Sequence, residues 1–402
     1  MPARSRSSSL SRTSLSLVSL AEALSHSGSQ LEDRWWQEQL GEALDKALNG
    51  RQGHSVETAL DYLLDQRSPA YEILVEQAEA HSESLSLTHQ DESYDVQLIS
   101  APLLAWTRYQ LPTGQLTAGH VRQLEDLMKA TVLAPGAALH LLPQLIRFDQ
   151  LPQSFRETRG WTQGLAQHAL GARRELPDVR SPDTPDDLLA DAYFLMGAAI
   201  VPRGQALFQW QSPQPGGQPD RAAVAAAWAQ GCARITDPLF TGCQMEYLPP
   251  EAFYTSTRQA DQGIRPLTLK AAVTWLLTAA RIPGEELRAA IVACGEQAIE
   301  EYRIGFCTRQ SNDVIYGCVW PSLSREESAL EPDEGAEGQV DTWDTLAALL
   351  RESGVQDVRR LPGLQPMEFC EDCGTPYFPN MLGEMQHPEL PEEIDPEPVQ
   401  FH

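Results

Sequence analysis

The residues best suited to chemistry lie in the segment "FCEDCGTPYFPNMLGEMQHPELPEE", residues 369–393. Cys370 and Cys373 are three positions apart, Gly374 follows directly, and His387 comes fourteen residues after the second cysteine. Two thiolates at this spacing converge on one tetrahedral cation, and a glycine after them permits a tight turn whose backbone amides point at sulfur. The sequence therefore predicts a small structural zinc site with Cys370, Cys373 and His387 as ligands.

Other uses of the two cysteines stay open. They also fit a pair of reduced thiols in a turn, or a thioredoxin-like redox pair. The redox pair needs the start of a helix after a buried strand, whereas Pro376 and Pro379 oppose a long helix here. We also expect the flanking Glu371 and Asp372 to raise the thiol pKa, which disfavours redox chemistry.

The remaining ligands depend on how the segment folds. We expect "TPYFPNMLGEMQ" to return as a hairpin that brings His387 back to the two sulfurs. The sequence leaves the fourth ligand open between His402, Glu384 and a water molecule. Because an incomplete ligand set lowers the metal affinity, zinc that is lost on purification is also consistent with this site.

Arginines suggest a second kind of chemistry. Arg258 and Arg265 flank "QADQGI", and Arg303 lies in "EYRIGFC". A guanidinium group binds carboxylate or phosphate as a rigid fork, so these three are candidates for a small anionic ligand in a groove between repeated units. Surface ion pairs are the alternative. In "AHSESLSL", His81 and Glu83 fit either an acid/base pair or a capped helix end with a solvated histidine.

The elements that position these residues indicate an α+β fold. Helical spacing of apolar residues runs through residues 15–83, and two strand-like runs around a polar turn follow in "SLSLTHQDESYDVQLISAPLLAW". We expect this helical segment to precede two related strand-helix-strand-helix units. The expected organisation is a disordered start (1–14), the helical segment (15–83), a first unit (84–175), a second unit with a C-terminal hairpin (186–321), an acidic linker (322–338), a truncated third unit (339–366), and the Cys-x-x-Cys loop with an acidic tail (367–402).

The two units are inferred from an ungapped match between "PGAALHLLPQL" (135–145) and "TGCQMEYLPPE" (241–251). The match pairs Gly136 with Gly242 and Pro143 with Pro249. Each segment follows a strand-like run and a helix-like stretch, so the same order of elements occurs twice and indicates an internal duplication. Two such units can share a sheet and bury what neither buries alone. We therefore expect Pro143 and Pro249 each at the end of a strand that a helix precedes.

A family resemblance covers nearly the whole chain. The segments "LEDRWWQEQL", "LAWTRYQLPTG", "IRPLTLKAAVTWL", "EYRIGFCTRQSNDVIYGCVWP", "VRRLPG" and the cysteine segment occur in an order that resembles a beta-proteobacterial family filed as domain of unknown function 2863. The resemblance implies a bacterial, cytoplasmic protein with colinear relatives. It implies no activity, and no functional residue is carried over from it.

Composition limits the classes of function. The net charge is −26, and residues 321–402 alone carry nineteen acidic residues against four arginines. This balance disfavours nucleic-acid binding, which depends on Lys and Arg. We expect no nucleotide cofactor, because a glycine-rich phosphate loop is missing, and no membrane association, because no continuous apolar run reaches about 20 residues.

The seven cysteines lack the spacing of a disulfide framework, which indicates a reducing cytoplasm. The sequence thus favours a cytoplasmic binding or scaffolding protein with a protein or small-molecule partner. The alternative is an enzyme or sensor that acts on a small anionic ligand.

Overall fold

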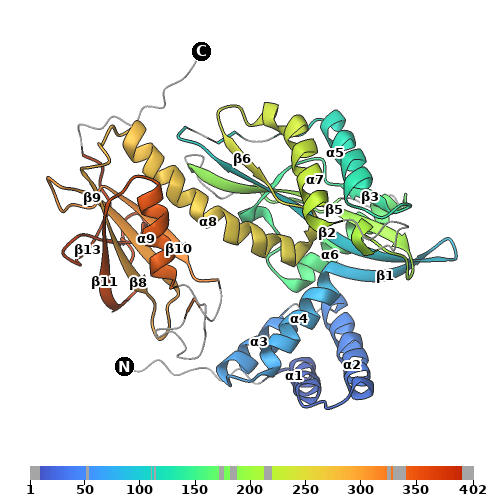
Figure 1. The fold of residues 1–402 in the computed structure, drawn as a ribbon. Helices are drawn as coiled ribbons and strands as arrows, with labels where there is room; N and C mark the ends of the chain where they lie inside the picture. Colours follow the sequence, from blue (N-terminus) through green and yellow to red (C-terminus); the bar gives the residue numbers. More distant parts are fainter. Residues whose placement is uncertain are drawn as a thin grey trace.

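The computed structural model describes residues 10–50, 54–109, 111–112, 115–171, 176–181, 188–211, 220–323, 327–328 and 341–391. Within them the chain forms a mixed α+β fold with two main sheets (Figure 1). Most of the expected disordered start, most of the acidic linker, and the tail from residue 392 onward, with His402, lie outside the described residues.

The N-terminal part is a helical unit, as expected. Its helices are α1 (Arg12–Ser25), α2 (Gln30–Asn49), α3 (Ser55–Asp65) and α4 (Ala70–Glu83). α1 begins three residues before the expected Leu15, because the Ser11 side chain caps it by accepting a hydrogen bond from the Ser14 amide. Leucines on the inner faces form a separate core; Leu40 and Leu44 are fully buried.

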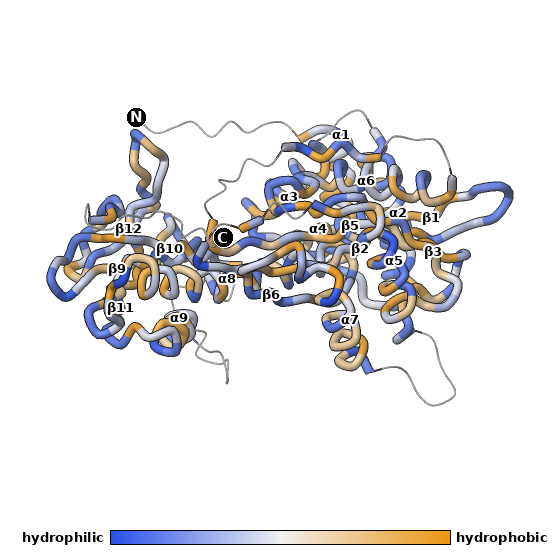
Figure 2. Tube along the Cα trace, turned by 90° about the horizontal axis from the view of Figure 1, so that it is seen from above, coloured by the Kyte–Doolittle hydropathy of each residue, from blue (hydrophilic) through white to orange (hydrophobic). Residues whose placement is uncertain are grey.

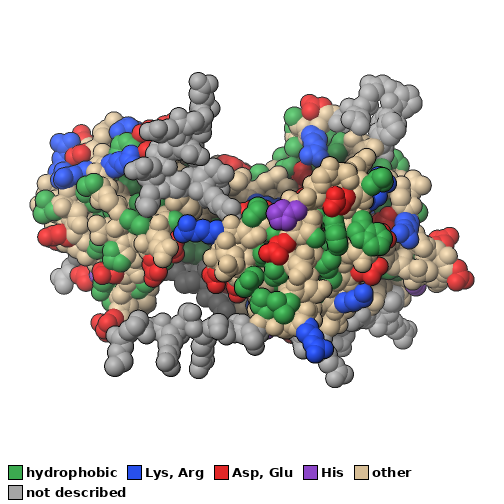
Figure 3. Space-filling model, turned by 90° about the horizontal axis from the view of Figure 1, so that it is seen from below, with side chains coloured by type: hydrophobic (Ala, Val, Ile, Leu, Met, Phe, Trp, Pro, Cys, Tyr) green, Lys and Arg blue, Asp and Glu red, His purple; other side chains and the backbone are tan. Residues whose placement is uncertain are grey.

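The outer face of the helical unit mixes apolar and charged side chains (Figure 3). Within the described parts of the chain, most of the large hydrophobic side chains that are exposed belong to α1, α2 and α3, namely Leu15, Leu31, Trp35, Tyr62 and Leu64.

The larger sheet is built around two long antiparallel strands, β2 (Glu92–Trp106) and β5 (Ala190–Pro202). The shorter strands are β1 (Ser84–His89), β3 (Ala138–Leu141), β4 (Ile146–Arg147), β6 (Gln244–Tyr247) and β7 (Glu251–Ala252). β1 and β2 form the expected hairpin. β2 and β5 read as nearly continuous apolar runs because helices cover both of their faces.

Two helices pack on each face of this sheet. α5 (Ala118–Thr131) and α7 (Arg221–Thr236) cover the face of Leu103 and Tyr193, and α6 (Phe155–Ala169) and α8 (Phe253–Thr278) cover the face of Leu104 and Phe194. Short 3-10 turns occur at Phe148–Gln150, Gln209–Gln211 and Asp237–Leu239.

The register of the larger sheet is symmetric about one residue pair. Ala101 of β2 faces Leu195 of β5. β6 pairs with β2 from Leu103 onward, and β3 pairs with β5 from Gly197 onward, so each short strand ends opposite the residue two positions beyond the central pair. Pro143 comes two residues after β3, and Pro249 comes two residues after β6. Each of these strands follows a helix, and neither proline lies in one.

The smaller sheet has the order β10-β9-β8-β11, with β8 (Leu287–Cys294), β9 (Glu301–Thr308), β10 (Tyr316–Pro321) and β11 (Asp357–Gln365). The C-terminal half of α8 and α9 (Thr342–Glu352) pack on one face. The segment expected as one second unit, residues 186–321, is therefore divided between two sheets. β8 pairs in parallel with β11, which follows the acidic linker, and apolar patterning cannot reveal such a distant partner.

α8 connects the two sheets. Its first part, including Phe253 and Ala260, belongs to the core of the larger sheet, while Val273 and Leu276 belong to the core of the smaller one. The larger sheet and the smaller sheet, each with its helices, form two lobes, and Figures 1 and 2 both show α8 running between them. The helix continues through Pro266, although a proline inside a helix removes one backbone hydrogen bond.

In the described parts of the chain, none of the helices combines the length and the apolar character that crossing a bilayer requires.

Candidate metal centre

The other face of the smaller sheet carries the cysteine segment. Its hairpin consists of β12 (Phe378–Pro379) and β13 (Met385–Gln386), so the expected fold-back of "TPYFPNMLGEMQ" is confirmed. Two glycines that face each other across β9 and β10 allow this close approach. A Cβ atom at Gly305 would lie 2.0 Å from the Pro379 carbonyl oxygen, and one at Gly317 would lie 2.3 Å from the Phe378 ring.

The cysteines sit in a tight turn. The Gly374 amide donates to the Cys370 carbonyl at 2.9 Å, and the Cys370 amide donates to the Thr375 carbonyl at 2.8 Å. Gly374 has φ +74°, in the left-handed region that favours glycine. The turn that the sequence predicts around this glycine is thus confirmed.

Three ligand atoms converge in this turn. The two sulfurs and an imidazole nitrogen of His387 all lie within 4.8 Å of one another. Cys373 Sγ lies 3.2 Å from His387 Nε2. Tetrahedral zinc with bonds of about 2.3 Å to sulfur and about 2.0 Å to nitrogen places such atoms about 3.5 Å apart, so the arrangement fits a metal ion. The residues present therefore could hold zinc, through two thiolates and one neutral imidazole.

The surroundings of Cys373 favour its thiolate, the form that binds a metal ion. The pKa of the Cys373 thiol is lowered to about 6, mainly by the Thr375 hydroxyl and also by the Thr375 amide and His387. The expectation that Glu371 and Asp372 raise the thiol pKa is wrong for Cys373, because both carboxylates are exposed and the donors of Thr375 act at closer range.

A carboxylate lies behind the histidine. His387 Nδ1, on the far side of the ring from Cys373, is 3.8 Å from Glu389 Oε1. This separation is too long for a hydrogen bond, and His387 Nδ1 is buried without a hydrogen-bond partner in the described chain, so Glu389 lies near the ring without orienting it. Glu384, one of the expected fourth ligands, instead accepts a hydrogen bond from the Asn380 side chain at 2.8 Å and lies outside the cluster. His402 falls outside the described residues.

The three arginines do not form one anion site in the described chain. Arg258 pairs with Glu79 of α4 at 2.7 Å, and Arg265 pairs with Glu327 at 2.8 Å. Arg303 lies on β9, fully buried beneath the cysteine segment. Each guanidinium group is thus bound by groups of the protein itself.

The family comparison covers the metal centre and both sheets. A family model described as a protein of unknown function, DUF2863, matches residues 2–401. The chain belongs to this family. No curated protein and no solved structure matches the chain. The resemblance inferred from the sequence is confirmed at the level of the DUF2863 family.

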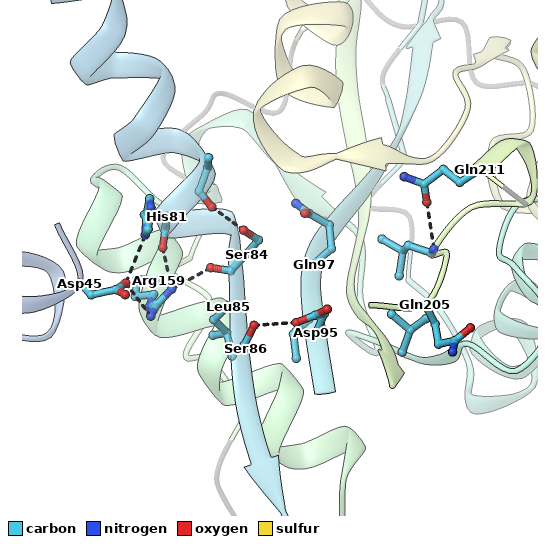
Figure 4. A pocket seen from close by; sticks show the side chains of 14 residues that line it. Asp45, His81, Ser84, Leu85, Ser86, Asp95, Gln97, Arg159, Gln205 and Gln211 are labelled. Carbon is cyan, nitrogen blue, oxygen red and sulfur yellow. Dashed lines mark hydrogen bonds and ion pairs between the residues drawn. The ribbon is translucent and has the colours of Figure 1, made fainter. Parts of the chain in front are cut away.

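A cavity of about 520 Å³ lies where the helical unit meets the β1 edge of the larger sheet (Figure 4). At one end Asp45 accepts a hydrogen bond from Arg159 Nη2 at 3.0 Å and lies 3.4 Å from His81 Nδ1. The hydrogen bond with His81 and the charge of Arg159 lower the pKa of Asp45. The rest of the lining mixes polar residues with apolar ones, namely Ser84, Ser86, Asp95, Gln97, Gln205 and Gln211 with Ala80, Leu85, Val96, Val201 and Leu207.

Sequence reasoning missed the composition of this cavity. The carboxylate partner of His81 is Asp45, 36 positions earlier, and not the nearby Glu83. Glu83 accepts a hydrogen bond from the Tyr254 amide at the start of α8. One signal was available, since Gly41 lies in the middle of a helix. A Cβ atom there would come within 2.7 Å of the His81 ring. Arg159 pairs with Asp45, and Asp95 accepts hydrogen bonds from Ser86 and the Gly204 amide, so the charged groups of the cavity indicate no ligand class.

Proposed function

We propose that the chain is a zinc-containing binding or scaffolding protein in which the metal has a structural role. The observation that carries this proposal is the convergence of Cys370, Cys373 and His387, whose ligand atoms lie within 4.8 Å of one another. A structural role is supported by the place of the site, at the open end of a hairpin that packs on the smaller sheet. A metal ion there ties the turn to the far arm of the hairpin, as structural zinc does in small metal-binding modules.

Other features support a cytoplasmic binding protein. All seven cysteines are free thiols, as a reducing compartment favours. The net charge of −26 argues for a protein or small-molecule partner over nucleic acid. The cavity between the helical unit and the larger sheet has a volume of about 520 Å³, within the usual range for small-molecule sites.

We further propose that the two halves of the larger sheet arose by internal duplication. Support comes from the matched glycines Gly136 and Gly242, which have φ of +90° and +84° and each precede a short strand by two residues. The symmetric register about Ala101 and Leu195 gives further support, because a duplication that placed two copies side by side in one sheet would produce such a register.

The zinc proposal predicts about one zinc ion per chain in protein purified without chelator. The double variant Cys370→Ser, Cys373→Ser should lose the metal, because serine is a poor zinc ligand, and should melt several degrees below the parent protein. Elemental analysis and thermal melting measure both effects. Cys243→Ser, at a half-buried cysteine remote in sequence, is the matched control and should keep its zinc.

A metal content well below one zinc per chain after reconstitution, together with unchanged melting of the double variant, would leave two reduced thiols in a turn and refute the proposal.

A further inference from the structure

We propose that Arg303 is a positioning residue for the metal centre: its buried guanidinium group holds both ends of the turn that carries the two cysteines. This inference rests on the proposed zinc site. The two ends of the turn are the backbone carbonyls of Glu368, two residues before Cys370, and Tyr377, four residues after Cys373. Arg303 Nη1 donates to the first at 2.6 Å and to the second at 2.9 Å.

The contacts of Arg303 fix it beneath the turn. Its Nε donates to Glu301 Oε1 at 2.6 Å, which neutralises the buried charge. The Phe369 ring lies 4.9 Å from the guanidinium carbon and covers it from outside. The side chain has no solvent exposure. The group is therefore unable to bind a ligand from solution, and all of its bonds but the one to Glu301 serve the cysteine turn.

An arginine suits this place for a geometric reason. Two carbonyl oxygens and one carboxylate are reached at once by a planar group with a rigid fork of donors, whereas a lysine offers a single nitrogen. Burying Arg303 costs free energy that an apolar side chain would not cost, because Arg303 Nη2 is buried without a hydrogen-bond partner. Apolar replacement of a buried ion pair is often neutral for stability. The particular contribution of Arg303 is thus the shape of the turn.

The third ligand is anchored separately. Beside His387, the Gln386 side chain accepts a hydrogen bond from the Val314 amide at 3.3 Å, and the Glu389 amide donates to the Val314 carbonyl at 2.8 Å. Arg303 therefore bonds the turn of the two sulfurs, and Val314 bonds the segment of the imidazole. The pairing of Phe378 with Gln386 and the bond from the Tyr377 amide to the Glu368 carbonyl also join these parts. Removing Arg303 leaves only those backbone bonds, so the turn is held less firmly relative to His387 and the three ligands converge less well.

The test uses full-length protein stripped of metal, titrated with Co²⁺ and then with Zn²⁺ in competition. Arg303→Lys should bind zinc at least tenfold more weakly than the parent protein, as other changes behind metal ligands do. Its cobalt spectrum should keep the sulfur-to-metal charge-transfer bands, while the ligand-field bands shift as His387 is lost. Arg288→Lys is the matched control. Arg288 lies on the neighbouring strand β8 and pairs with Asp357 at 2.8 Å, so zinc affinity should not change.

The outcomes separate the two proposals. A parent protein that binds neither Co²⁺ nor Zn²⁺ refutes the zinc site itself. Parent-like affinity and spectrum in a folded Arg303→Lys protein overturn the role of Arg303 and leave the zinc site standing. If Arg303→Lys does not fold, Phe369→Ala decides, because the half-exposed ring covers the guanidinium group without belonging to the core. We expect Phe369→Ala to weaken zinc binding about threefold, and parent-like affinity overturns the inference.

Discussion

Glu83 illustrates how the surroundings of a single residue change its chemistry. Its carboxylate accepts a hydrogen bond from the Tyr254 amide at 2.9 Å, in the first turn of α8. Burial raises the pKa of Glu83 from 4.5 to about 7. A carboxyl group with a raised pKa stabilises the folded chain in its protonated form. This contribution is fully present below pH 4.5 and is lost as the pH rises through about 7.

We predict that Glu83→Gln stabilises the protein relative to the parent protein, and that this effect is larger at pH 8 than at pH 5. A neutral amide oxygen still accepts the hydrogen bond from Tyr254, and the cost of burying a charge disappears. The difference in the free energy of unfolding between the variant and the parent protein should be on the order of 1 to 2 kcal/mol larger at pH 8 than at pH 5. Urea unfolding at both pH values measures the gain. Glu76→Gln, at an exposed position of the same helix, is the control. An equal effect of Glu83→Gln at pH 5 and pH 8 would contradict the prediction.

Residue roles were predictable from sequence where they are local. Cys370, Cys373 and His387 span only a turn and a hairpin, so their spacing alone indicates one site. Arg303 acts on carbonyls that are 65 and 74 positions away, and no spacing rule connects them. The sequence did single out Arg303 as a candidate residue for anion binding. In the structure, backbone carbonyls and Glu301 occupy the guanidinium group in place of a bound anion.

At the scale of elements, the smaller sheet depends on two glycines. Gly305 of β9 and Gly317 of β10 form a directly opposed pair, and the hairpin of the metal centre lies against them. Side chains at these positions would push the hairpin away from the sheet. The apolar contacts that join hairpin and sheet, including Phe378 and Met381, would then be opened to water.

We predict that Gly305→Ala lowers the free energy of unfolding by about 2 kcal/mol, because its Cβ would lie 2.0 Å from the Pro379 carbonyl oxygen and the backbone must move. Denaturant unfolding measures the loss. Gly160→Ala is the matched control. Gly160 lies in the middle of α6 with open space around a Cβ, so alanine should stabilise by about 0.5 to 1 kcal/mol there. Parent-like stability of Gly305→Ala would show that the hairpin is not packed this closely.

Individual elements follow from local patterns better than their partners do. The hairpins β1–β2 and β9–β10 appear where alternation predicts them, and the helices α1 to α4 appear where helical spacing predicts them. The division of residues 186–321 between two sheets was not predictable. The apolar sequences of β5 and β8 do not show which strands they pair with. β11, which pairs with β8, follows the acidic linker in the sequence.

At the scale of the whole molecule, α8 contributes to two cores. Phe253 and Ala260 pack under the larger sheet, and Val273 and Leu276 pack under the smaller one. Gly263 brings the helix close to the larger sheet, since a Cβ atom there would lie 2.6 Å from the Leu104 side chain. Neither core is complete without this helix.

We predict that the two sheets unfold in one calorimetric transition. A helix shared by both cores cannot unfold for one sheet and remain folded for the other without exposing apolar surface. Leu276→Ala, in the smaller core, should therefore lower the melting temperature of β2 and β5 as well as that of β8 and β9, by several degrees. Scanning calorimetry measures the transition, and two resolved transitions with only one shifted would contradict the prediction.

The shared helix α8 also couples the stability of the larger sheet to metal binding at the smaller one. Amide hydrogens in the middle of β2 and β5 exchange with solvent only when their sheet opens, and opening disturbs α8 and with it the smaller sheet. Zinc bound at Cys370, Cys373 and His387 opposes that disturbance from the other lobe. It would slow exchange at Ala101 and Leu195, in strands that it never touches, so isotope labelling could detect the metal from the opposite end of the molecule.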